Sequence, residues 1–282
     1  MEKQQATVML ENAAARDEGN GAGPMPSAAR SASDRSPASA AARRSRAQAE
    51  SSPATRTLAI DIGGSGIKAE VLDAHGKSLT ERARLSTPRR AIPQALVAAI
   101  ETLANSQGAY DRVSVGFPGV VKNGIIETAP NLGPRWQGCN LAKLLRQRLH
   151  RPVRVANDAA VQGLGAVRGR GVEMVLTLGT GVGSALFVDG RLVPNLEFGH
   201  HPFRKGKTYE DELSHAALLK VGKKRWNKRL LKAIETLAPV FNYRMLYLGG
   251  GNSKFIKAAL PRNVKVISNL EGILGGVALW RN

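Results

Sequence analysis

The chain has 282 residues, of which 43% are hydrophobic, so it is long enough to bury one large core or two modest ones. This composition excludes disorder throughout. Lys and Arg number 41 against 22 Asp and Glu, a net charge of +19, which favours nucleic acid, an anionic membrane surface or a polyanionic substrate. A single cysteine, Cys139, excludes an intramolecular disulfide and a cysteine-rich zinc site.

Residues 1–56 differ in composition from the rest. They are rich in Ala, Ser and Arg, lack a sustained apolar period, and carry eight Lys and Arg against six Asp and Glu. Such a segment cannot bury enough apolar surface to offset its ordering entropy, so we expect a disordered N-terminal extension. The basic surface is then expected on residues 57–282, with net +17. Without a run of roughly 20 apolar residues or an apolar signal region, the sequence predicts a cytoplasmic protein.

From Thr57 the sequence predicts alternating strands and helices. An apolar run, the turn Gly63-Gly64-Ser65-Gly66 and a second apolar run through Val71 predict a strand, a glycine turn and a strand. A helix is expected at 93–105, where Leu96, Ile100 and Leu103 share one face. The next predicted elements are strands at 112–117 and 153–156 and helices at 141–149 and after Asp158.

The opening arrangement then recurs. Strands are expected at 173–178 and 183–188, separated by the turn Gly179-Thr180-Gly181. This repetition predicts two related α/β halves, residues 57–157 and 158–282, with a ligand in the cleft between them. The other predicted elements are helices at 209–220, 226–239 and 270–279 and strands at 192–193, 245–248 and 264–267.

Three glycine loops follow predicted strands, and each can bind phosphate oxygens through backbone N–H groups. The first also carries the carboxylate of Asp61 and the charge of Lys68. Any one loop alone could be a structural turn, but three together favour an oligophosphate. Walker-A and Gly-x-Gly-x-x-Gly spacings are missing, which disfavours a P-loop or Rossmann site. The candidate phosphate-binding residues are Asp61, Gly63, Gly64, Ser65, Lys68, Thr180, Gly181, Gly250 and Gly251.

Four motifs resemble those of the ROK sugar kinases: residues 58–68 (LAIDIGGSGIK), 155–158 (VAND), 176–184 (LTLGTGVGS) and 197–200 (EFGH). The resemblance covers about residues 57–282. Residues 117–121, 184–190 and 224–229 are most similar to the polyphosphate glucokinase branch. This resemblance implies a two-domain α/β fold of the actin-like ATPase (ribonuclease H-like) type, with the active site in the interdomain cleft.

The resemblance also implies roles for site residues. Asp158 would be the catalytic base that accepts the proton of the attacking hydroxyl. An Asn-Asp pair taken alone is more typical of a turn or helix N-cap, so the family context carries this assignment. Glu210 competes for its sugar-binding role with Asp211 and Glu212. The residues expected at the sugar are Asn131, Asn157, Glu197, His200 and Glu210.

Most ROK members carry a cysteine-built zinc site after this His. Residues 200–209 contain no Cys, so we expect no zinc, as in the polyphosphate glucokinase branch. Mg²⁺ is expected to arrive with the donor phosphates and to be held indirectly through Asp61.

A basic stripe bears on the choice of donor. Lys224, Lys228 and Lys232 follow Lys220 at intervals of four on a predicted helix, so one face is strongly positive. Such a run is often only a solvated face. It would also suit a polyphosphate chain.

The sequence therefore predicts a sugar kinase that transfers a phosphoryl group from polyphosphate, ATP or both to the 6-hydroxyl of glucose or a related hexose. The alternatives are a ROK-type sugar-sensing transcriptional regulator, which needs a helix-turn-helix that residues 1–56 do not suggest, and an inactive kinase fold that binds a polyanion. The expected partners are a hexose and a polyanionic donor, without nucleic acid or membrane. The physiological donor, the preferred hexose and a homodimer are left open.

Overall fold

The structure, a computed structural model, describes residues 55–194 and 196–281. The extension predicted over residues 1–56 lies almost wholly outside this range. None of the helices in the described residues is long and apolar enough to cross a membrane.

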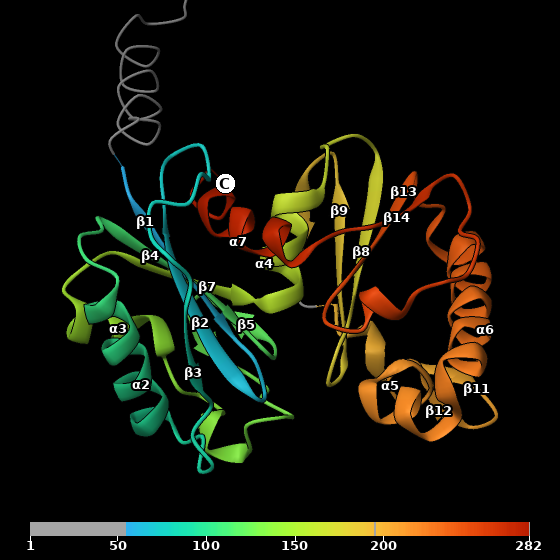
Figure 1. The fold of residues 1–282 in the computed structure, drawn as a ribbon, viewed down its shortest axis with the longest axis horizontal. Helices are drawn as coiled ribbons and strands as arrows, with labels where there is room; N and C mark the ends of the chain where they lie inside the picture. Colours follow the sequence, from blue (N-terminus) through green and yellow to red (C-terminus); the bar gives the residue numbers. More distant parts are fainter. Residues whose placement is uncertain (1–54, 195, 282) are drawn as a thin grey trace, which may run out of the picture. The chain divides into compact units, whose positions relative to one another are not determined.

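Two five-stranded sheets form the framework (Figure 1), and they share one topology. In each, an antiparallel hairpin and a third antiparallel strand are followed by two parallel strands. The first sheet has the order β3-β2-β1-β4-β7, with β1 Thr57–Ile62, β2 Gly66–Leu72, β3 Ala83–Ser86, β4 Arg112–Phe117 and β7 Val153–Asn157. The second has the order β10-β9-β8-β13-β14, with β8 Val172–Leu178, β9 Val182–Val188, β10 Arg191–Val193, β13 Met245–Gly249 and β14 Val264–Val266. The predicted recurrence of the opening arrangement is confirmed.

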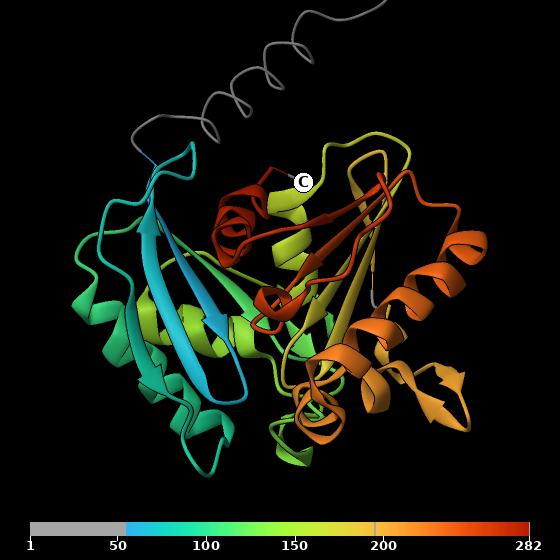
Figure 2. The same cartoon turned by 45° about the vertical axis from the view of Figure 1, so that its right-hand side comes forward.

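Helices cover the faces of both sheets. Helices α2 (Pro93–Ser106) and α3 (Leu141–Leu149) pack on the first sheet and close a core that includes Leu96, Ile100 and Leu145. Helices α5 (Tyr209–Leu213) and α6 (His215–Phe241) cover one face of the second sheet. Helices α4 (Asp158–Ala166) and α7 (Asn269–Ala278) lie between the two sheets (Figure 2).

Glycines allow α4 and α7 to approach closely. A Cβ atom on Gly275 of α7 would overlap the carbonyl oxygen of Val161 in α4. Helix α7 also packs on the first sheet, where the Ser114 hydroxyl donates to the Gly276 carbonyl at 2.5 Å and accepts from Trp280 Nε1 at 2.8 Å. The last helix of the chain therefore contacts the first sheet, although the sequence places it after the second. The division into residues 57–157 and 158–282 stays a prediction.

The predicted elements agree closely with the observed ones in most of the chain, and two differences are informative. The helices expected at 209–220 and 226–239 were wrong in their bounds, because α5 ends at Leu213 and α6 runs to Phe241. A kink interrupts α6 at Gly222, which has a φ of 76° that glycine adopts without strain. Strand β3 was missed, since only one bulky apolar residue, Leu85, marks it. The remaining short strands are β5 (Val121–Lys122), β6 (Ile125–Ile126), β11 (Pro202–Arg204) and β12 (Lys207–Thr208).

The contact between α4 and α7 predicts a large effect of one methyl group. Ala favours a helix over Gly by about 1 kcal/mol, but Gly275→Ala would force α7 away from Val161. We expect the free energy of unfolding, measured by urea denaturation, to fall by roughly 1–3 kcal/mol. Gly251→Ala is the control, because a Cβ there meets no atom within 4 Å. Equal stability of the two variants would contradict the close approach.

Candidate active site

A cavity of about 470 Å³ opens between the two sheets. All three glycine loops line it, together with the first turn of α4. The predicted sugar and phosphate residues that line this cavity are Asp61, Gly63, Gly64, Ser65, Lys68, Asn131, Asn157, Asp158, Thr180, Gly181, Glu197, His200, Glu210, Gly250 and Gly251. Residues spread over 190 positions of sequence are thus brought to one cavity by the two matching hairpins and the strand ends beside them.

The first glycine loop joins β1 to β2. Asp61 lies near the end of β1, and its Oδ2 is 3.1 Å from Lys68 Nζ on the paired strand. One expectation was wrong here: the N–H of Gly63 is not free for a phosphate, because it donates to the Gly66 carbonyl at 2.9 Å. This bond closes the turn and leaves Gly64 and Ser65 exposed at its tip. Gly63 therefore shapes the loop, and the next two residues are its available donors.

The second and third glycine loops are fastened to each other by Asn252, which the sequence analysis missed. This side chain is 3% exposed, and its Nδ2 donates to the Gly179 carbonyl at 3.3 Å. Its Oδ1 lies 2.9 Å from His215 Nδ1, and the His215 N–H donates to the same carbonyl at 2.7 Å. Gly250 has a φ of 81°, and a Cβ there would collide with the Leu178 backbone. The two loops thus form one preorganised edge of the cavity.

Asn157 and Asp158 stand at the N-terminus of α4. The Asn157 side chain caps the helix by accepting from the Ala160 N–H at 3.0 Å, and Asp158 Oδ1 accepts from the Ala159 N–H at 2.7 Å. The structural role typical of an isolated Asn-Asp pair is therefore present. It coexists with a position on the cavity wall, since both side chains line it.

The Asp158 carboxyl is unusually easy to protonate. Burial, followed by the nearby charges of Asp61 and Glu197, raises its pKa from 3.8 to about 7, against the opposing hydrogen bond from the Ala159 N–H. A group that changes charge near neutral pH can accept and release a proton under ordinary conditions. Such a shift in a cavity lined by convergent polar groups is typical of a catalytic acid or base.

Two further carboxylates face the same region. Glu197 Oε1 is 3.4 Å from Asn157 Nδ2, and its Oε2 is 4.0 Å from His200 Nε2. Glu210 Oε2 accepts from the Val182 N–H at 2.9 Å. Burial raises the pKa of Glu197, with a further rise from Glu210 and a reduction by His200. Carboxylate acceptors beside an imidazole donor suit the neighbouring hydroxyls of a polyol.

The three consecutive acids of α5 have separate environments. Asp211 forms a capping box with Thr208. Glu212 is 4% exposed and its carboxylate lies near three cations, Arg204, Lys207 and Arg229. Glu210 alone of the three lines the cavity. Position therefore favours Glu210 over Asp211 and Glu212, and its sugar-binding role stays a prediction.

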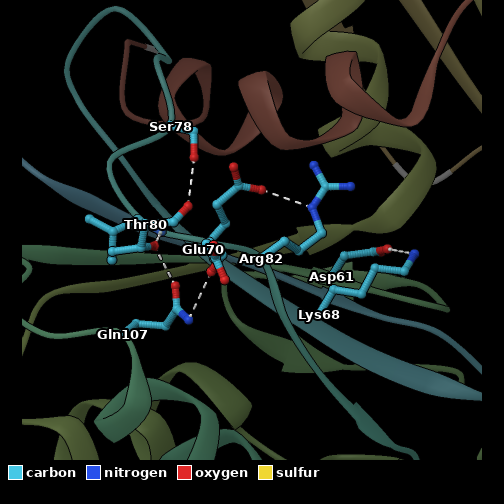
Figure 3. Close-up of polar contacts among 9 residues, drawn as sticks. Asp61, Lys68, Glu70, Ser78, Thr80, Arg82 and Gln107 are labelled. Atoms are coloured by element: carbon cyan, nitrogen blue, oxygen red, sulfur yellow. Dashed lines mark hydrogen bonds and ion pairs between the residues drawn. The ribbon is translucent and has the colours of Figure 1, made fainter.

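Cations that the sequence analysis missed also line the cavity. Arg84 of β3 lies opposite Lys68 of β2 in the strand register, so both side chains can share one face. Arg82 Nε is 2.8 Å from the carboxylate of Glu70, which is 5% exposed (Figure 3). Lys254 follows the third glycine loop. Arg82 and Arg84 were missed because the short edge strand β3 gave little signal. The cavity therefore has an acidic end and a basic wall.

The basic stripe of Lys224, Lys228 and Lys232 does not line this cavity. All three side chains are exposed on α6, and Lys232 lies 3.3 Å from Glu235. Lys220 belongs to the part of α6 before the kink at Gly222, so the predicted four-residue series is interrupted. The three lysines after the kink remain on one continuous helix.

A magnesium ion bound with donor phosphates needs only one or two protein carboxylates. Asp61 fits this requirement, because its side chain is 47% exposed beside the first glycine loop and lines the cavity. Within residues 55–194 and 196–281, no group of three His, Cys, Asp or Glu residues could hold a metal by itself.

Comparison with known proteins gives consistent relatives. The sequence pattern of the ROK family matches residues 57–209. The chain is 31% identical over 237 residues to a polyphosphate glucokinase of Mycobacterium leprae, covering 78% of this chain and 73% of the relative. It is also 31% identical to a polyphosphate glucokinase of Mycobacterium tuberculosis, with 77% and 88% covered. The solved inorganic polyphosphate/ATP-glucomannokinase of Arthrobacter sp. strain KM superposes with a TM-score of 0.73 at 32% identity, over 79% of this chain and 97% of that one.

The raised pKa of Asp158 predicts how stability depends on pH. A carboxyl with a higher pKa in the folded state binds its proton more tightly when folded, so stability is lost as pH rises from about 4 to about 7. Asp158→Asn removes this titration. The free energy of unfolding of the variant, measured with urea, should therefore rise relative to that of wild type by roughly 1–3 kcal/mol as the pH is raised from 4 to 8. The exposed Glu127→Gln serves as the control, and parallel pH curves for Asp158→Asn and wild type would refute the shift.

Proposed function

The chain belongs to the ROK family, and on this premise we propose that it is a sugar kinase that transfers a phosphoryl group from polyphosphate or ATP to the 6-hydroxyl of glucose or a related hexose. The observation that carries the proposal is the position of Asp158. Its carboxyl, with a pKa of about 7, stands in one cavity with acidic side chains and three glycine loops. The fold, that of the actin-like two-domain ATPases, supports the same activity.

In the proposed reaction Asp158 accepts the proton of the sugar hydroxyl as the oxygen attacks the terminal phosphorus of the donor. The bond from that phosphorus to the bridging oxygen breaks, and the donor leaves shortened by one phosphoryl group. A pKa near the working pH is favourable for such a general base. Asn157, Asn131 and the acids Glu197 and Glu210 would accept or donate hydrogen bonds to the other hydroxyls, with His200 as a donor. This arrangement would hold one hydroxyl in line with the donor, which is the main requirement in phosphoryl transfer.

The donor phosphates would lie along the glycine loops. The N–H groups of Gly64 and Ser65 and the Thr180 hydroxyl can donate to phosphate oxygens, and Lys68 supplies a positive charge. Mg²⁺ held through Asp61 would neutralise charge on the transferring group when it is bound. We retain the boundary between Asn157 and Asp158 as the proposed division of two domains that enclose the substrates.

A polyphosphate donor needs cations beyond the cavity, and a physical link to the basic stripe supports this donor. Phe255 lines the cavity. The Lys254 ammonium lies 5.1 Å from the centroid of its ring, and the Lys223 ammonium lies 5.0 Å from it. Lys223 directly precedes Lys224, the first residue of the stripe. Positive charge therefore continues from the third glycine loop onto α6.

The catalytic role is tested with Asp158→Asn. This change keeps the shape of the side chain and removes the base, so kcat should fall by at least about 10²-fold while circular dichroism stays unchanged. Wild-type kcat/KM should rise with pH up to about 7 and then level off, because the base acts when deprotonated. The kcat of Asp211→Asn, which changes a carboxyl outside the cavity, should stay close to the wild-type value. A folded Asp158→Asn enzyme with more than about a tenth of the wild-type kcat would overturn the assignment.

The donor is tested with the triple change of Lys224, Lys228 and Lys232 to Glu. ATP fits within the glycine loops, whereas a long chain extends past them, so KM for polyphosphate should rise much more than KM for ATP. Polyphosphate KM should also climb more steeply with salt in the wild type than in the variant, through counterion release. The matched control changes the exposed Lys122, Lys143 and Arg146 to Glu. Equal effects on both donors would identify the stripe as a solvated face.

A further inference from the structure

A second cavity, of about 580 Å³, lies at the other end of α4 from Asp158. Its walls are the last turn of α4, the loop 167–171, Glu173 of β8, and the strands β13 and β14 with the residues that flank them. It shares no lining residue with the first cavity. Asp158 and Ala166, at the two ends of the nine-residue helix α4, are about 12 Å apart along its axis.

Four cations line this second cavity. Arg168 and Arg170 come from the loop after α4, and Arg244 and Lys265 come from β13 and β14 and their flanks. All four residues are exposed, and none forms an ion pair within the described part of the chain. Like charges gathered around one hollow repel each other unless an anion lies between them.

Among the described lining residues Glu173 is the one carboxylate, and it accepts hydrogen bonds from backbone N–H groups instead of pairing with these four side chains. It is 1% exposed, and its carboxylate accepts hydrogen bonds from the backbone N–H groups of Arg168 at 2.9 Å, Gly169 at 2.7 Å and Arg170 at 3.1 Å. The Tyr247 hydroxyl donates to its Oε1 at 2.9 Å. Burial raises the pKa of Glu173, but the hydrogen bonds outweigh burial and hold it below its ordinary value. The ionised carboxylate therefore fixes the loop that presents two of the four cations.

This arrangement suits phosphate groups. Guanidinium groups match phosphate oxygens with paired N–H donors, and a loop that is fixed in advance lowers the ordering cost of binding. The C-terminal end of α4 contributes about half a negative charge, which is small beside four cations and one carboxylate. The volume exceeds that of one water many times over, at about 30 Å³ each, so there is room for more than one phosphate group.

We infer that the second cavity is a binding site for a phosphate-bearing anion, separate from the donor site. The anion has two potential sources. It is either a free small molecule, such as an oligophosphate, or a distant segment of a long polyphosphate chain whose end reaches the first cavity. The inference does not depend on the proposed kinase activity, because it rests on the charge and shape of a cavity outside the candidate active site.

Binding is tested with pyrophosphate and the full chain carrying Asp158→Asn, by isothermal titration calorimetry. Two classes of site are expected. Adding Arg168→Glu and Arg244→Glu, from two different segments of the lining, should weaken one class by at least about tenfold and leave the other intact. Adding Lys143→Glu and Arg146→Glu gives the same charge change away from both cavities and should retain both classes. Circular dichroism checks folding, and the corresponding Ala variants replace any Glu variant that fails to fold. An unchanged isotherm in the folded cavity variant would overturn the inference.

The source of the anion is separated by kinetics, with Asp158 intact. If a distant donor segment occupies the second cavity, Arg168→Glu with Arg244→Glu should raise KM for long-chain polyphosphate severalfold and leave KM for tripolyphosphate unchanged. Unchanged KM values together with lost pyrophosphate binding indicate a free anion. Failure of the kinase proposal would be seen instead as no hexose-dependent transfer from any donor, with pyrophosphate binding still present.

Discussion

The arrangement of the whole site depends on the close contact between α4 and α7. No side chain separates Gly275 from the Val161 carbonyl, so the two helices meet backbone to backbone between the sheets. Helix α7 is also bonded to the first sheet through Ser114, while α4 packs on the second sheet through Ala159, Ala160 and Ala166. The closeness of α4 and α7 sets the distance between the two sheets. It thereby fixes the distance from Asp158 to the glycine loops on either side.

The electrostatics of the first cavity follow from this spacing. Acids gather where α4 begins, and burial, together with the nearby charges of Asp61 and Glu197, raises the pKa of Asp158 to about 7. Cations gather on the face of β2 and β3, where Lys68 and Arg84 are register neighbours. A polar substrate that needs proton removal and an anionic substrate that needs charge neutralisation can therefore occupy adjoining parts of one cavity. Rigid loops tied by Asn252 supply the orientation that such a reaction requires.

Sequence patterns predicted the parts of this molecule in which local signals agree. Apolar runs ending in glycine turns identified β1, β2, β8 and β9, and the cavity gathers the residues at their ends. The predictions failed where the position of a residue depends on contacts that form only on folding. Arg82 precedes β3 and Arg84 belongs to it, a strand with one bulky apolar residue, and their positions depend on its pairing with β2. The break expected between residues 220 and 226 is only a kink at Gly222 within one helix, and the use of the Gly63 N–H depended on turn closure.

The distribution of acids explains how so basic a chain presents its charge in defined places. Among the residues whose burial the structure describes, three glutamates are almost fully buried, at 5% exposure for Glu70, 1% for Glu173 and 4% for Glu212. Each holds basic residues in position: Arg82 on the cavity wall, the loop of Arg168 and Arg170 at the second cavity, and a cluster that includes Arg229 of α6. A buried carboxylate without its donors would be strongly destabilising, so folding itself requires these contacts. The remaining cations then face solvent and the cavities. The excess positive charge is therefore concentrated on particular surfaces and is not spread evenly over the molecule.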